Sequence, residues 1–303
     1  MKLLAIDVGG TEIKSAVVDE CYELSDWNSV PTPSTCLEDF LNAIAEIYEP
    51  YREQVEGLAL SLPGFIDTEK GLCNSGGTLT YNAKQYVGPL LEERLGCRVL
   101  LENDAKAAAM AELANGALKG CCNAAAFIIG TGVGGAIIVD GKLIRGRKFT
   151  AGELSFVNVN IEKDENFQGG MCNYCSTPAL LKLYRDKSGC QEDVDGRELF
   201  RRFHAGDIHA QEALDEFTTS IAIQAMNLGV ILNCEKVAIG GGISRDAVLV
   251  EKIKEKMDGL GVNRLIAAND TENYMMPEVV PCHYSADANL IGAAYSYMLR
   301  TVN

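Results

Sequence analysis

Asp7, Gly9, Gly10, Thr11 and Lys14 bring a carboxylate, two glycines, a hydroxyl and an ammonium group into one short segment. Backbone N–H groups beside glycine are unhindered and can bind phosphate oxygens. The Asp7 carboxylate can hold Mg²⁺ directly or through water, and Lys14 adds a positive charge. The same composition is also typical of an ordinary hairpin turn, so the segment alone supports both interpretations.

A second glycine-rich turn runs from Gly130 to Gly135 and contains Thr131 and Gly132. Gly130, Gly132 and Gly135 match the G-x-G-x-x-G spacing of dinucleotide-binding proteins. That motif must open a helix, whereas residues 136–139 form an apolar strand pattern. The sequence also lacks the G-x-x-x-x-G-K-[ST] pattern of P-loop nucleotidases. The pattern therefore predicts a second phosphate-binding hairpin.

Strand-like and helix-like patterns alternate around these turns, which is typical of the α/β class. Residues 157–176, rich in Asn, Gly and acids, are predicted to form a surface loop. We expect strands at 3–6, 15–18, 57–62, 99–101, 124–129, 136–139 and 236–239, and helices at 37–48, 105–114, 209–232, 247–257 and 289–299.

Composition restricts the class of partner. The chain has 303 residues, 47% of them hydrophobic, and a formal net charge of -15. This charge disfavours nucleic acids and anionic membrane surfaces, and no apolar run approaches the roughly 20 residues of a membrane span. The first residues do not resemble a signal peptide. We therefore expect a cytoplasmic protein whose eleven cysteines are reduced and mostly buried.

Four segments together resemble the ROK family of repressors and sugar kinases, and the resemblance covers nearly the whole chain. They are Asp7–Thr11, Glu102–Ala105, Gly130–Gly135 and Gly240–Gly242. The resemblance implies an actin-like ATPase (ribonuclease H-like) fold with two lobes around a nucleotide and sugar cleft. It implies a sugar-binding lobe at 1–112 plus 286–303, a nucleotide-binding and dimerisation lobe at 113–285, and a homodimer.

The family also implies ATP and Mg²⁺ as cofactors and assigns roles to matching residues. The first phosphate motif falls on Gly9, Gly10, Thr11 and Lys14, and the second falls on Thr131 and Gly132. The adenosine motif falls on Gly241 and Gly242, and Asp7 is the carboxylate that holds magnesium.

Asp104 matches the family's catalytic base. A sugar hydroxyl is a weak acid, and a nearby carboxylate can take its proton as the phosphorus–oxygen bond forms. Asn103 is positioned to hold another hydroxyl. Asp104 also fits the N-cap of the following helix, and both roles can hold together.

Further sugar contacts are implied at Glu153, which matches a family glutamate that binds sugar hydroxyls, and at Gly64 and Gly76 in two loops. These loops span residues 63–67 and 74–77. Glycine and asparagine are common in any loop, so the loop residues carry less information than Glu153.

The sequence departs from many ROK proteins after Glu153. A histidine that belongs to a zinc site in those relatives is replaced by Phe156, and the downstream cysteines are reduced to the pair Cys172 and Cys175. No zinc is expected. The segment 175–181 resembles zinc-lacking relatives, including the β-glucoside kinases of Gram-positive bacteria.

The resulting prediction is ATP-dependent phosphorylation of a hexose or hexoside hydroxyl, with the 6-hydroxyl of glucose or a β-glucoside favoured. Phe156 offers an apolar surface that suits an aglycone. N-acetylmannosamine and fructose are the alternative substrates. The alternatives from other classes are a sugar-sensing regulator, whose relatives carry a DNA-binding domain, and a sugar-binding protein without catalysis.

Overall fold

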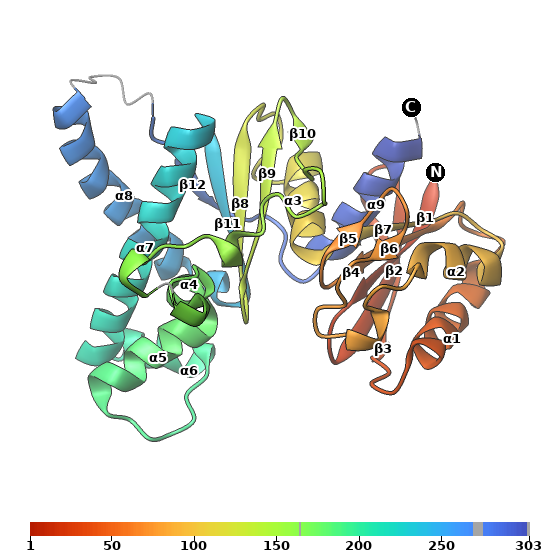
Figure 1. Cartoon of the computed structure of the whole chain (residues 1–303), viewed down its shortest axis with the longest axis horizontal. Helices are drawn as coiled ribbons and strands as arrows, with labels where there is room; N and C mark the ends of the chain where they lie inside the picture. Colours follow the sequence, from red (N-terminus) through yellow and green to blue (C-terminus); the bar gives the residue numbers. More distant parts are fainter. Residues whose placement is uncertain (164, 269–274, 302–303) are drawn as a thin grey trace. The chain divides into compact units, whose positions relative to one another are not determined.

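The computed structural model describes residues 1–163, 165–268 and 275–301. The chain divides into two compact units (Figure 1). The first comprises Met1–Gly116, Arg145–Ala151 and Ala286–Asn303, and the second comprises Ala117–Ile144 and Gly152–Ser285. The segment Arg145–Ala151 thus joins the first unit, although the chain before and after it belongs to the second.

The first unit is built on a five-stranded sheet in the order β3-β2-β1-β4-β7. β1, β2 and β3 are antiparallel, whereas β4 and β7 run parallel to β1. A short antiparallel pair, β5 and β6, lies in the loop after β4. The bounds are β1 Lys2–Val8, β2 Glu12–Asp19, β3 Leu24–Pro31, β4 Leu58–Leu62, β5 Ile66–Asp67, β6 Leu72–Cys73 and β7 Val99–Asn103.

Alternating side chains of β1 bury both faces of this sheet, because successive residues of a strand point to opposite sides. Leu4 and Ile6 belong to the core formed with α1 and α2, whereas Leu3 and Ala5 belong to the core formed with α9. Figure 1 shows α1 and α2 on one side of the sheet and α9 on the other. The helices of this unit are α1 Leu37–Tyr48, α2 Val87–Leu95, α3 Asp104–Asn115 and α9 Ala288–Thr301.

The second unit repeats the same strand order, β10-β9-β8-β11-β12. A hairpin of β8 and β9 is followed on one side by β10 and on the other by the parallel strands β11 and β12. The bounds are β8 Ala124–Ile129, β9 Val133–Val139, β10 Lys142–Leu143, β11 Lys236–Gly241 and β12 Glu278–Pro281.

The core of the second unit combines side chains of β8 and β11 with those of its helices. The longest helix, α7, packs against both α5 and α8. The helices are α4 Cys172–Cys175, α5 Thr177–Ser188, α6 Gly196–His204, α7 Ile208–Leu232 and α8 Ala247–Ala268. Short 3-10 turns of the chain lie at Glu49–Tyr51, Thr80–Asn82, Leu154–Phe156, Ile161–Lys163, Glu165–Phe167 and Gly242–Arg245.

The predicted α/β class, strands and helices are confirmed, but the predictions for residues 157–176 and for the burial of the cysteines are wrong. Residues 157–176 do not form a simple surface loop, because the segment ends in α4 and buries Met171 and Cys175 against the core of the second unit. The cysteines are free but not mostly buried: only Cys73, Cys121, Cys175 and Cys234 are. None of the helices in the described ranges has the length and apolar character that a membrane span requires.

Candidate active site

The carboxyl ends of β1, β4 and β7 bring several predicted site residues of the first unit to one edge of its sheet. In the strand register Asp7 lies beside Ser61, and Ser61 lies beside Glu102. Asn103 and Asp104 follow Glu102 directly. Because ligands of open α/β sheets bind outside the carboxyl ends of parallel strands, this edge is the candidate site.

Asp7 is held by two hydrogen bonds to a single carboxylate oxygen. Its Oδ1 accepts from the Ser61 hydroxyl at 2.9 Å and from the Asn289 amide at 2.9 Å. Within the described residues, Oδ2 accepts no hydrogen bond. Burial raises the pKa of Asp7, and the two hydrogen bonds and the Lys14 charge oppose this rise only partly. A divalent cation at Oδ2 would supply positive charge that stabilises the ionised carboxylate, so the site fits Mg²⁺.

The first glycine turn connects β1 to β2 at Gly9, Gly10 and Thr11. The Gly9 N–H donates to the Glu12 carbonyl at 2.9 Å, and the Thr32 hydroxyl donates to the Gly9 carbonyl at 2.8 Å. Gly10 and Thr11 are exposed, and within the described part of the chain their N–H groups donate to no other backbone group. These two groups are therefore available to an anion.

The turn between β7 and α3 fixes Asp104. Asn103 is the last extended residue, and its Oδ1 accepts from the Lys106 N–H, so Asn103 is the N-cap of α3. The prediction that Asp104 caps this helix is wrong, because α3 begins at Asp104, one residue earlier than predicted, and the cap therefore falls on Asn103. Asp104 Oδ1 accepts from the Asn103 amide at 2.9 Å and from the Ala105 N–H at 2.7 Å. The half-buried carboxylate is thus oriented by its neighbours.

The two predicted sugar loops lie against each other in the same unit. The Gly64 carbonyl accepts from the Asn103 amide at 3.0 Å, which links the first loop to the candidate base. Gly64 has a φ of 95°, and an added Cβ would lie 2.3 Å from the Ser75 carbonyl oxygen. The buried Gly76 lies beside Ser75 in the second loop. Close backbone contact therefore joins the two loops, and the Asn103 side chain joins the first of them to the strand edge that carries Asp104.

The predicted nucleotide residues of the second unit share the corresponding edge of its sheet. The Gly130 N–H donates to the Gly132 carbonyl at 3.0 Å, which closes the turn around the exposed Thr131. β11 places Gly241 beside Ile129, the residue before this turn. The adenosine motif, with the exposed Gly242, and the second phosphate motif are therefore neighbours in the fold.

Gly241 is expected to tolerate no side chain. Its φ is 101°, and an added Cβ would lie 2.1 Å from the Ile129 carbonyl oxygen. Gly241→Ala is expected to lower the free energy of unfolding by about 2 kcal/mol through backbone strain and to raise the KM for ATP about tenfold, as calorimetry and steady-state kinetics would measure. Gly242→Ala is the matched control for the stability measurement, because an added Cβ there meets no atom within 4 Å. Equal destabilisation of the two variants would contradict this interpretation.

Glu153 begins the short turn that follows Gly152 in the second unit. It is half-buried, and its carbonyl accepts from the Phe156 N–H at 3.1 Å. The Phe156 ring is 58% exposed and lies 5.3 Å from the Phe167 ring, centroid to centroid. One ring of this exposed aromatic pair, Phe156, thus lies three residues after the candidate sugar ligand in the sequence.

Cys172 and Cys175 form the ends of the short helix α4. Burial raises the pKa of the Cys175 thiol to about 12 and also raises that of Cys172. Zinc binds the deprotonated thiolate, which burial disfavours. No cluster of three or more metal-ligating His, Cys, Asp or Glu side chains was found among residues 1–163, 165–268 and 275–301.

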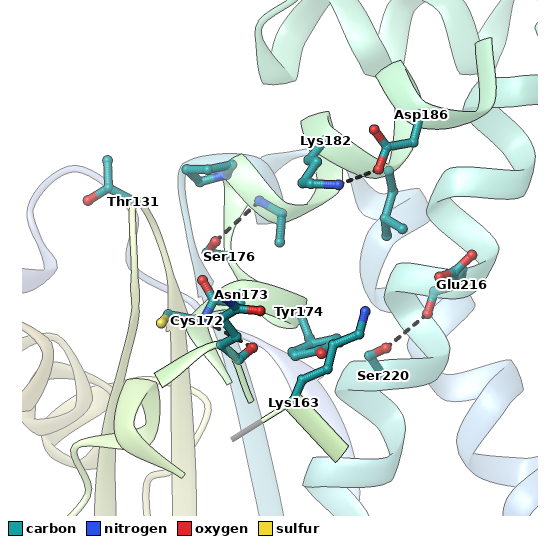
Figure 2. Close-up of a pocket in the computed structure, with 14 residues that line it drawn as sticks. Thr131, Lys163, Cys172, Asn173, Tyr174, Ser176, Lys182, Asp186, Glu216 and Ser220 are labelled. Carbon is teal, nitrogen blue, oxygen red and sulfur yellow. Dashed lines mark hydrogen bonds and ion pairs between the residues drawn. The ribbon is translucent and has the colours of Figure 1, made fainter. Parts of the chain in front are cut away.

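A cavity of about 560 Å³ in the second unit was not predicted from the sequence (Figure 2). Of the predicted site residues, Thr131 lines it, whereas Gly241 and Gly242 do not. Lys182 and Asp186 pair with each other at its wall. Besides Thr131, its lining comes from α4, α5, α7 and the loop before α4: Lys163, Gln168, Cys172, Asn173, Tyr174, Ser176, Pro178, Ala179, Lys182, Leu183, Asp186, Glu216 and Ser220.

Known proteins resemble this chain along its whole length. A family model described as the ROK family matches residues 3–298. A beta-glucoside kinase of Listeria monocytogenes is 29% identical and covers 98% of both chains. A ROK family protein from Streptococcus pneumoniae in complex with sucrose is 29% identical, with a TM-score of 0.87 and 99% of each chain covered. A ROK hexokinase from Thermus thermophilus is 28% identical, with a TM-score of 0.84 and 100% of each chain covered. The predicted sugar-kinase fold is thereby confirmed, and the chain belongs to the ROK family.

Proposed function

We propose that this chain transfers the γ-phosphoryl group of ATP to a hydroxyl of a hexose or hexoside, with the 6-hydroxyl as acceptor. The observation that carries the proposal is the orientation of Asp104, whose Oδ1 is fixed by Asn103 and Ala105. It lies at the same sheet edge as the first glycine turn and Asp7. The names of the related kinases support the same reaction.

Asp104 acts in this mechanism as the general base. Its carboxylate accepts the proton of the sugar hydroxyl while the oxygen attacks the γ-phosphorus in line with the departing ADP. Asn103 holds the carboxylate in place and, through Gly64, holds the loop that binds the sugar. Orientation of both reactants is the main source of catalysis in phosphoryl transfer.

The phosphates are bound by backbone groups of the two hairpins, Gly9–Thr11 and Thr131–Gly132, and Lys14 contributes positive charge. Asp7 would hold Mg²⁺ together with the nucleotide, and the ion would neutralise phosphate charge. We assign sugar binding to the first unit, including Gly64, Gly76 and Asn103, and nucleotide binding and homodimer formation to the second, where Gly241 and Gly242 receive the nucleoside. Glu153 contributes a sugar contact from the second unit. The eleven free cysteines are consistent with a reducing cytoplasm.

Glucose or a β-glucoside is the proposed acceptor, because Phe156 presents an exposed apolar ring close in sequence to Glu153. A relative named beta-glucoside kinase supports this choice. In a coupled ADP-release screen with Mg-ATP, we expect kcat/KM for glucose or cellobiose to exceed that for N-acetylmannosamine and fructose by at least about tenfold. Preference for either of the latter two would refute the substrate proposal and leave the kinase proposal intact.

The same screen decides between catalysis and binding alone. If calorimetry detects sugar binding while no sugar stimulates ADP release, the chain is a sugar-binding protein or regulator and the kinase proposal is wrong. Product analysis by ³¹P NMR separates transfer to the 6-hydroxyl from transfer to another position.

A further inference from the structure

The segment Arg145–Ala151 crosses into the first unit between two parts of the second, and we call it the strap. The first residue of the strap, Arg145, contacts the core of the first unit through its own side chain. Arg145 Nη2 forms an ion pair with the Glu102 carboxylate and donates to the Ser296 hydroxyl at 3.2 Å. The Ser296 hydroxyl in turn donates to Glu102 Oε2 at 2.9 Å.

Two members of this triad are buried, and the third, the Arg145 side chain, is 24% exposed. Glu102 is 1% exposed and Ser296 is 3% exposed, and both lie in the first unit, on β7 and α9. A buried carboxylate without a partner is strongly unfavourable, so the Arg145 guanidinium is the charged partner that holds the Glu102 side chain in place. Both side-chain hydrogen bonds of Arg145 come from Nη2, whereas its Nε is buried without a partner in the described residues.

Glu102 also contacts the residue that positions the candidate base. While Oε2 is held by Arg145 and Ser296, Oε1 accepts from the Asn103 N–H at 3.2 Å. The Asn103 amide donates to Asp104 Oδ1 at 2.9 Å. A continuous series of polar contacts therefore runs from Arg145 through Glu102 and Asn103 to Asp104.

We propose that Arg145 is a positioning residue for Asp104 and that it couples the strap to the general base through Glu102. The inference rests on the proposed function of Asp104. The strap ends two residues before Glu153, so displacement of the strap would reach a second candidate sugar ligand as well. The effects on Asp104 and on Glu153 differ kinetically, because misplacing the base lowers kcat, whereas misplacing a sugar ligand raises KM.

The test compares Arg145→Met with Arg145→Lys and with Arg147→Met. Arg147 is an exposed residue of the same strap and serves as the matched control. Arg145→Met is expected to lower kcat between about 10- and 100-fold, because small misplacements of a catalytic group are costly, with KM for sugar and ATP within about threefold. Arg145→Lys should recover most of kcat, since one ammonium nitrogen can replace Nη2, and Arg147→Met should match the native protein.

Hydrogen exchange detected by mass spectrometry gives a readout independent of activity. Arg145→Met should accelerate amide exchange in residues 102–105 and leave α1 unchanged. If Arg145→Met does not fold, Ser296→Ala removes one contact of the triad and should produce a smaller effect of the same kind.

Three results would overturn the inference: a raised KM with unchanged kcat, a lowered kcat without faster exchange in residues 102–105, or an equal loss in Arg147→Met. A native protein that phosphorylates no sugar would refute the proposed function instead. In that case unchanged exchange at residues 102–105 in Arg145→Met would also refute the positioning contact.

Discussion

Asp104→Asn is expected to lower kcat for sugar phosphorylation about 10³-fold and to leave the sugar's Kd within a few-fold. The asparagine oxygen can still accept the hydrogen bonds that Asp104 Oδ1 receives from Asn103 and Ala105, so the local structure should be retained. The amide cannot accept the proton of the attacking hydroxyl. Coupled ADP-release kinetics measure the first quantity and titration calorimetry the second.

Asp258→Asn is a suitable control for this experiment, because Asp258 is exposed on α8 and lies outside the candidate site. It should retain native kinetics. A kcat for Asp104→Asn within tenfold of the native value would show that Asp104 is not the base.

Asp7→Asn is expected to lower kcat/KM for Mg-ATP about 100-fold while making the metal-free protein more stable at neutral pH. The asparagine oxygen can accept from Ser61 and Asn289 as before, but the ligand loses the charge that Mg²⁺ prefers. Burial raises the pKa of Asp7 in the folded chain, so the ionised carboxylate destabilises the fold at pH values above that raised pKa.

The sign of the stability change can be checked through pH. The penalty of ionised Asp7 is present at neutral pH and disappears as pH falls below the ordinary aspartate range, where the carboxyl is protonated in both the folded and unfolded chain. Thermal unfolding in EDTA should therefore show Asp7→Asn more stable at pH 7 and no gain at pH 3. A lower midpoint for the variant at pH 7 would show that the carboxylate stabilises the fold.

The sequence predicted the scaffold of the site because its signals are local. Apolar runs that stop at glycines define β1, β8 and their hairpins, and the 3.6-residue spacing of apolar side chains defines α1 and α7. Parallel strands then place residues from distant segments at one edge, so Asp7 and Asn103 are brought to the same sheet edge by topology rather than by any local pattern.

Features that depend on tertiary contacts were missed. The N-cap of α3 is Asn103 and not Asp104, since either residue can accept from the helix N–H groups and the end of β7 decides between them. The strap was missed because Arg145 and Glu102 are far apart in the sequence, and a charged pair has no periodicity that marks its burial. The cavity beside Thr131 was missed for the same reason, because its lining comes from separate helices.

The most direct test of the proposed phosphoryl transfer is to follow the fate of the phosphorus atom. Native protein and Asp104→Asn are incubated in parallel with Mg-ATP and glucose or cellobiose, and the products are resolved by ³¹P NMR. We predict that the native protein forms one sugar 6-phosphate for each ADP and that the variant forms about 10³-fold less in the same time. ADP accompanied by inorganic phosphate alone would contradict phosphoryl transfer to the sugar. Equal sugar phosphate from both proteins would contradict the role of Asp104 as the base.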